Sequence, residues 1–284
     1  MNIRAGVSAS AIAAAMVVGL AAETAPASVQ INFAAVVGDK PFACGQKYEG
    51  IGTTKSTITV SDFRFFVSGV ALIDKSGTET AVALTQDGKW QSGNAALIDV
   101  EDGTATCSNG TPDTRAFIEG TVPAGEYVGL RFDVGLPFDV NHKDPTTAPS
   151  PLNLSRLFWN WNGGYKFARI DMKTTGQPQG WVLHLGSTNC SPDNGPTSVP
   201  TTCANENKPR VVLTPFNAAT QAVQLDLAAM LAQSNVDVNT NDTASGCMSG
   251  NNDPECKGVF ATLGLPFGDV PAGAQSVFTA IPRR

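Results

Sequence analysis

The sequence predicts an all-β fold: an antiparallel β-sandwich with long, disulfide-stapled loops and at most one or two short helices. Short β-rich segments follow one another along the chain, and turn clusters separate them roughly every 8–12 residues, a pattern typical of sandwiches and barrels. Glycine and proline are frequent, at 28 and 18 of the 284 residues, and charged residues account for only 15%. This composition disfavours long helices.

The expected strands can be placed in chain order by their β-branched and aromatic content. They cover residues 56–60, 65–73, 81–84, 95–100, 116–122, 127–134, 157–161, 166–172, 181–185 and 211–215. Turn clusters such as Asp-Lys-Ser-Gly at 74–77 and Pro-Ala-Gly at 123–125 separate neighbouring segments. One amphipathic helix is expected at 226–233, because its leucine and alanine side chains would share one side.

Two long segments interrupt this rhythm. Residues 137–151 contain four prolines and a histidine, and residues 186–209 are rich in proline, asparagine and serine and contain two cysteines. Loops of this length in a compact domain are usually functional or disordered. A disulfide within the second loop would favour order.

The N-terminus has the features of a signal peptide. Arg4 provides a positive charge, residues 11–22 are small and apolar, and Ala-Pro-Ala at 25–27 fits a cleavage site. The apolar stretch is too short to span a bilayer, which takes roughly 20 residues, and no later segment is long and apolar enough. We therefore expect residues 1–27 to be a signal peptide, and residues 28–284 to form a single exported β-sandwich domain without membrane insertion.

Six cysteines remain after the expected cleavage. They are Cys44, Cys107, Cys190, Cys203, Cys247 and Cys256. An even count in an exported chain predicts three disulfides, although sequence alone leaves the connectivity open. Loop closure favours the local pairs Cys190–Cys203 and Cys247–Cys256, which leaves Cys44 with Cys107. The alternative is a thiolate metal site, but the chain contains no Cys-x-x-Cys spacing.

Charge and motif content exclude several function classes. The net charge is −6 and the pI about 4.9, and no run of lysine or arginine occurs, so a nucleic-acid partner is not expected. The nucleophile, zinc-protease, phosphate-loop and dinucleotide motifs are all missing. We therefore expect a protein that is not an enzyme. A secreted hydrolase with paired carboxylates remains the alternative, since sequence does not show which acids meet.

The two histidines stand out because they are scarce. His142 lies in the first long loop, and His184 lies at the end of an expected strand that leads into the second. Imidazole is a common ligand of transition metals, and two imidazoles outside the cytoplasm suit copper. The plain alternative is two unrelated histidines satisfied by hydrogen bonds.

Tryptophans form the second notable feature. Trp159 and Trp161 are two residues apart, so they would share one face of a strand. Core packing can explain them without any function. The other interpretations are a carbohydrate-stacking platform that also uses Tyr165, and a redox-active indole.

Several segments occur in the order typical of a known family. They are 62–68 (DFRFFVS), 96–103 (ALIDVEDG), 135–138 (GLPF) with Asn141 and His142, 158–161 (FWNW), 164–167 (GYKF), 184–188 (HLGST) with Cys190, and 247–250 (CMSG) with 253–256 (DPEC). In these segments, which extend over nearly the whole mature chain, the sequence resembles the methanobactin-associated periplasmic copper-binding family, MbnP.

The resemblance implies a function that composition does not. Such proteins are periplasmic, bind copper, and are encoded beside a dihaem enzyme similar to bacterial cytochrome c peroxidases and MauG. That enzyme oxidises a tryptophan of its partner to kynurenine. The resemblance implies copper ligation by His142 and His184, and leaves Trp159, Trp161 and Trp181 as candidates for modification. An extracytoplasmic carbohydrate- or surface-binding module is the alternative function.

Overall fold

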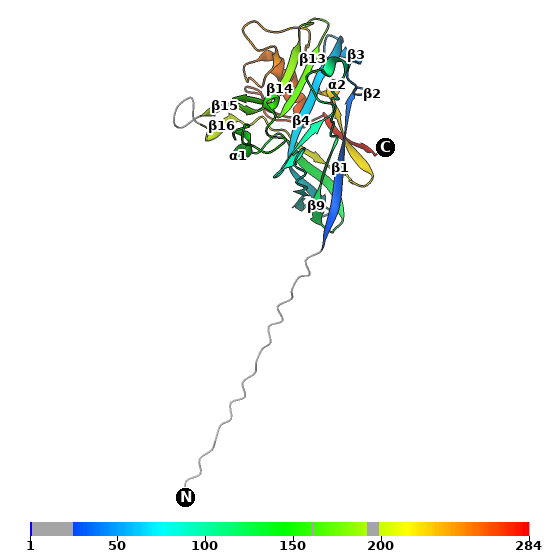
Figure 1. Cartoon of the computed structure of the whole chain (residues 1–284), viewed down its shortest axis with the longest axis vertical. Helices are drawn as coiled ribbons and strands as arrows, with labels where there is room; N and C mark the ends of the chain where they lie inside the picture. The colour runs from blue at the N-terminus through cyan, green and yellow to red at the C-terminus, as the bar shows by residue number, and fades with distance from the viewer. Residues whose placement is uncertain (2–24, 161, 192–198, 284) are drawn as a thin grey trace.

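Two β-sheets make up most of the molecule, as the computed structural model in Figure 1 shows. The structure describes residue 1 and residues 25–160, 162–191 and 199–283. The smaller sheet has six strands: β20 (Phe278–Pro282), β18 (Gln221–Asp226), β1 (Pro26–Val37), β9 (Phe117–Pro123) and β6 (Ala83–Leu84) in spatial order, with β2 (Lys40–Pro41) beside β1. The predicted all-β sandwich is confirmed.

The larger sheet has ten strands. In spatial order its main path is β17 (Arg210–Leu213), β10 (Tyr127–Val134), β4 (Ser56–Asp74), β13 (Ala168–Lys173), β14 (Trp181–Leu185) and β19 (Gly246–Cys247). Four short strands complete it: β3 (Lys47–Ile51), β5 (Glu79–Ala81), β7 (Gln91–Ser92) and β8 (Ala95–Asp99). Most pairs are antiparallel, but β1 pairs with β18 and β14 with β19 in parallel.

The core lies between the two sheets and is rich in aromatic side chains. Phe33 of β1 contacts Phe65 of β4 and Phe132 of β10 edge to face, with ring centroids 5.8 and 5.7 Å apart. Phe278 of β20 contacts the same two rings of the larger sheet. Such edge-to-face pairs add to the free energy gained by burying the rings. The two sheets are thus joined without any contribution from the histidines.

Strand β4 pairs with five other strands of the larger sheet, and it merges two of the expected strands. Phe63 and Phe65 are buried toward the core, while Asp62 and Arg64 alternate with them on the opposite face. The charged pair interrupts the apolar pattern of the sequence. That pattern therefore indicates two strands, although the structure has one continuous strand.

Helices are few among the described residues. α1 (Phe138–Asn141) and α2 (Leu227–Met230) are single turns, and α3 (Pro254–Leu263) has ten residues. The predicted helix at 226–233 is thus reduced to α2. Helix α3 was not expected, because its side chains are buried on most of its surface and show no amphipathic period. None of the described helices is long and apolar enough to cross a membrane.

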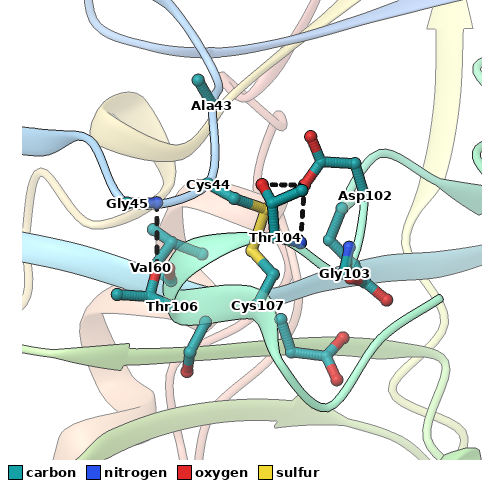
Figure 2. The surroundings of a disulfide bond; sticks show 12 residues. Ala43, Cys44, Gly45, Val60, Asp102, Gly103, Thr104, Thr106 and Cys107 are labelled. Atoms are coloured by element: carbon teal, nitrogen blue, oxygen red, sulfur yellow. Dashed lines mark hydrogen bonds between the residues drawn. A yellow bond between two sulfur atoms is a disulfide. The ribbon is translucent and has the colours of Figure 1, made fainter. Parts of the chain in front are cut away.

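Three disulfides are present, in the pairs that loop closure favours: Cys44–Cys107, Cys190–Cys203 and Cys247–Cys256. The first ties the segment before β3 to the 3-10 helix η1 (Ala105–Cys107). Figure 2 shows this bond together with the side chain of Thr106, which accepts from Gly45 N at 2.9 Å and donates to Val60 O at 2.6 Å.

The expected signal peptide lies largely outside the described residues. Strand β1 begins at Pro26, and Pro26 and Ala27 pair with Pro123 and Val122 of β9. The strand therefore includes two residues that cleavage near Ser28 would remove. The cleavage site stays a prediction.

Candidate metal centre

The outward face of the larger sheet carries a buried network of charges. Asp62 and Arg64 come from β4, Arg169 and Asp171 from β13, and His184 from β14. Alternation along each strand places their apolar neighbours in the core and these five side chains on the other face. Arg64 forms a salt bridge with Asp62, and Arg169 Nε lies 3.2 Å from the same carboxylate.

His184 is held at one end of this network. Its Nε2 lies 2.6 Å from Asp171 Oδ1, and Arg169 binds the other oxygen of Asp171 through Nε at 2.9 Å and Nη2 at 2.6 Å. Burial alone would raise the pKa of Asp171, but the hydrogen bonds from His184 and Arg169 outweigh it and hold the pKa at about 2. The carboxylate is therefore ionised and accepts the Nε2 proton.

The second ring nitrogen of His184, Nδ1, is not part of this network. The residue is only 6% exposed, and its Nδ1 is buried without a hydrogen-bond partner in the described part of the chain. Because Asp171 takes the proton on Nε2, Nδ1 carries the lone pair. Burial lowers the pKa of His184, although the hydrogen bond to Asp171 acts in the opposite direction. A buried, unprotonated imidazole nitrogen is a suitable ligand for a transition metal.

His142 follows α1 and is 4% exposed. Its tautomer can be inferred from Asn141, whose Oδ1 accepts from the main-chain N of Tyr165 at 2.8 Å. The amide nitrogen of Asn141 therefore faces His142 Nε2, at 3.2 Å, and donates to it. The lone pair of His142 is thus on Nε2. That nitrogen also lies 3.4 Å from Cys203 Sγ and 4.0 Å from Cys190 Sγ.

Trp159 packs on the chain just beyond His184. It belongs to β11 (Phe158–Asn160), which pairs with β12 (Gly164–Tyr165), and its ring packs directly on Gly186. A Cβ at Gly186 would lie 2.4 Å from Trp159 Cζ3, so only glycine permits this contact. Gly186 is two residues beyond His184, which places both on one face of the chain.

On its other side, Trp159 borders the cysteine hairpin. The hairpin consists of β15 (Thr188–Ser191) and β16 (Thr202–Asn205), which the Cys190–Cys203 bond joins. Trp159, Cys190 and Met248 line one surface pocket of about 380 Å³. Trp159 is thus partly exposed, packs on the residue two beyond His184, and shares a pocket with Cys190, whose sulfur lies 4.0 Å from His142 Nε2.

The other tryptophan candidates have different surroundings. Trp181 is fully buried in the core, and its Nε1 has no hydrogen-bond partner among the described residues. Trp161 lies outside the described residues. Tyr165 is also fully buried, and its hydroxyl donates to Leu152 O. The stacking platform of Trp159, Trp161 and Tyr165 considered above is therefore wrong as far as Tyr165 is concerned, because its ring cannot reach a ligand.

Close groupings of at least three potential metal-ligand atoms, within 4.8 Å of one another, occur at two places in the described residues. One joins His142 to Cys190 and Cys203, and the other joins Glu101 to Cys44 and Cys107. Both include a disulfide, whose sulfurs offer no thiolate. His184 belongs to neither grouping. A metal held by both histidines would need a further donor from between them.

Asp171 and Asn141, which set the histidine tautomers, were not identified from the sequence. Their contacts depend on strand register and on the path of the first long loop. The sequence does carry one signal for Asp171: charged residues alternate with apolar ones at 168–172, which indicates a polar outer face.

Comparisons with known proteins bear on the family and the overall fold. The family model described as MbnP matches residues 26–249. Among solved structures, MbnP from Methylosinus trichosporium aligns with a TM-score of 0.81 at 32% sequence identity, covering 92% of this chain and 100% of that chain. No curated protein matches.

Proposed function

Because the chain belongs to the MbnP family, we propose that it is a periplasmic, non-catalytic copper-binding protein and the protein substrate of a dihaem enzyme. Family membership places it among methanobactin-associated, copper-related proteins. The enzyme, similar to bacterial cytochrome c peroxidases and MauG, would oxidise one tryptophan to kynurenine. The observation that carries the copper assignment is the buried Nδ1 of His184, which has no partner among the described atoms.

Two donor atoms follow from the hydrogen bonds. His184 would bind copper through Nδ1, since Asp171 occupies Nε2. His142 would bind through Nε2, the nitrogen that carries the lone pair, and copper would there replace the hydrogen bond from Asn141. Metal-bound histidines usually give their other nitrogen to a carboxylate or carbonyl, which fixes the ring and strengthens the ligand. The Asp171–Arg169 pair supplies this support for His184.

The third donor would come from the modified tryptophan. An indole N–H has no lone pair to offer, whereas kynurenine has an aryl amine and a ketone. Of the candidates, Trp159 has the most support, because it is partly exposed at a surface pocket and packs on Gly186, close to His184. Trp181 has little support, because a fully buried ring is remote from any docked enzyme. Copper bound there would have two imidazoles and one aryl-amine or carbonyl donor, a set that suits copper.

Peptide mapping after co-expression with the dihaem enzyme and peroxide tests the modification. We expect the mass change of a tryptophan-to-kynurenine conversion, one oxygen gained and one carbon lost, on the peptide that contains Trp159. Trp159→Phe should abolish it, whereas Trp90→Phe, at a ring remote in sequence that contacts Lys89, should not. Four intact tryptophans under these conditions would refute the partner-substrate proposal.

Chelator competition tests the copper site. His142→Ala and His184→Ala should each weaken copper binding by about tenfold or more, because water is a poorer ligand than imidazole. Undiminished binding by the double variant would exclude both histidines as ligands. Protein made without the enzyme should bind copper more weakly than modified protein, since the third donor is then an indole.

A further inference from the structure

The Cys190–Cys203 disulfide lies against a histidine that already has its lone pair in place. Cys190 and Cys203 face each other across the β15–β16 hairpin, and their sulfurs are 4.0 and 3.4 Å from His142 Nε2. We propose that reduction of this disulfide converts it into a second metal site, with two thiolates and one imidazole, that takes Cu(I). Both sites use His142 Nε2, which binds one copper ion at a time, so the thiolate site replaces the site proposed above when the disulfide is reduced. The thiolate site requires neither His184 nor kynurenine.

The distances already suit a metal on the histidine side. Bonds of about 2.3 Å to sulfur and 2.0 Å to nitrogen, spread at trigonal angles, place ligand atoms roughly 3.7–4.0 Å apart. The nitrogen-to-sulfur distances are close to these values before any metal binds. Once the sulfur–sulfur bond is broken, the two sulfurs must move apart by about 2 Å from bonding distance, which side-chain rotation can supply. The metal must also displace the Asn141 amide from its hydrogen bond to His142 Nε2.

Reductant and metal can both reach this bond. Cys190 and Cys203 are each partly exposed, and Cys190 lines the surface pocket beside Trp159 and Met248. The Cys247–Cys256 bond is shielded, with side chains 1% and 0% exposed. Thiol–disulfide exchange requires that an attacking thiolate approach a sulfur. A dithiol should therefore reduce Cys190–Cys203 before it reduces Cys247–Cys256.

The chemistry balances with a dithiol as reductant. The dithiol gives up two electrons and two protons and closes its own disulfide, while the Cys190–Cys203 bond breaks and each sulfur gains a proton. The incoming metal then displaces the two thiol protons. Thiolate ligands favour Cu(I), and a three-ligand set suits it better than structural zinc, which takes four protein ligands.

The other disulfide with a nearby ligand provides an internal comparison. Cys44–Cys107 has the Glu101 carboxylate beside it and no imidazole. A carboxylate suits harder cations than Cu(I). Reduction there should therefore give no comparable Cu(I) site.

The test begins with full-length protein expressed without the dihaem enzyme, reduced anaerobically by a dithiol, desalted, and held folded. Alkylation and peptide mapping should find free thiols at Cys190 and Cys203. Competition with a coloured Cu(I) chelator should then show one Cu(I) bound at least about tenfold more tightly than by the oxidised protein. A folded protein in which Cys190–Cys203 resists the dithiol, or a reduced protein whose Cu(I) affinity is no higher than that of the oxidised protein, overturns the proposal.

Variants separate this site from the one proposed above. The gain in Cu(I) affinity on reduction should vanish in Cys190→Ser/Cys203→Ser, and reduced His142→Gln should bind Cu(I) at least about tenfold more weakly than reduced wild type. His184→Gln should weaken copper binding by the oxidised protein and leave the Cu(I) affinity of the reduced protein unchanged. If the double serine variant does not fold, wild-type protein alkylated at the two cysteines replaces it, and must also lack the gain in affinity. A gain that persists after either change would refute the site.

Discussion

Asp99 should make the protein less stable as pH rises through neutrality. This side chain of β8 is 3% exposed and lies opposite Arg64 of β4 in the sheet. Asp62, Asp99 and Glu101 all surround this one arginine, so three carboxylates share a limited positive charge. Burial raises the pKa of Asp99 from 3.8 to about 8. The positive charge of Arg64 acts to lower this pKa, and the negative charges of Glu101 and Asp62 act to raise it further.

The raised pKa of Asp99 determines whether the free energy of unfolding rises or falls with pH. Between pH 4 and pH 8 the folded protein keeps a proton on Asp99 that the unfolded chain releases, so the free energy of unfolding falls as pH rises. Each pH unit in this window costs about 1.4 kcal/mol, so the loss through this group is about 3 kcal/mol between pH 5 and pH 7. Asp99→Asn cannot ionise, so the variant should lack this component of the slope.

Urea denaturation of the disulfide-intact protein at pH 5, 7 and 8 measures the effect. The stability of Asp99→Asn relative to wild type should increase with pH, by about 3 kcal/mol from pH 5 to pH 7. Asp39→Asn, at an exposed position just after β1, is the matched control and should run parallel to wild type. Parallel curves for wild type and Asp99→Asn would refute the reasoning, because they would mean that the buried acid releases its proton as readily as in the unfolded chain.

Three further predictions concern the metal region and its supporting loop. Asp171→Asn replaces the carboxylate that holds His184 with a neutral amide and should lower copper affinity about 10–100-fold, as measured by chelator competition. Equal affinity would contradict the proposal that Asp171 orients His184 for copper. Gly186→Ala should displace the Trp159 ring, because the new Cβ would lie 2.4 Å from it. The displacement should appear as a shift in tryptophan emission and as weaker copper binding. Gly163→Ala, whose new Cβ would have its closest contact at 3.3 Å, should have a much smaller effect. Tyr165→Phe leaves a buried carbonyl without its donor and should cost about 1–3 kcal/mol in urea denaturation, and a smaller loss than this range would mean that water replaces the hydroxyl.

The sequence predicted those strands whose side chains alternate without interruption. β10 and β14 have the expected bounds, 127–134 and 181–185. β1 was not predicted, because it begins within the expected signal peptide. β18 was also missed, because it ends at Asp226, where the expected helix was placed to begin. Local pattern therefore located the strands but not their partners, and it gave no sign of the parallel pairs.

The same limit applies to the metal region. Scarcity and family resemblance singled out His142 and His184, and left Trp159, Trp161 and Trp181 as candidates for modification. Of these tryptophans, Trp159 packs on Gly186 just beyond His184 and shares a surface pocket with Cys190. The supporting partners of the histidines were not predicted. Asp171 is thirteen residues before His184 and meets it only through the register of β13 and β14, in which Asp171 lies opposite Val182. Periodicity carries no information about such a diagonal contact.

The separation between core and histidines sets an order of events in the life of the protein. The aromatic core is complete between the sheets, and Asp171 can orient His184 only after β13 and β14 have paired. If the protein binds copper as proposed, a chain built in this way would fold first and acquire copper afterwards, unlike small zinc domains that fold around their ion. Unfinished chains would then not trap copper, and the proposed haem enzyme would meet a folded surface. Metal supply could vary widely without changing how much folded protein the cell maintains.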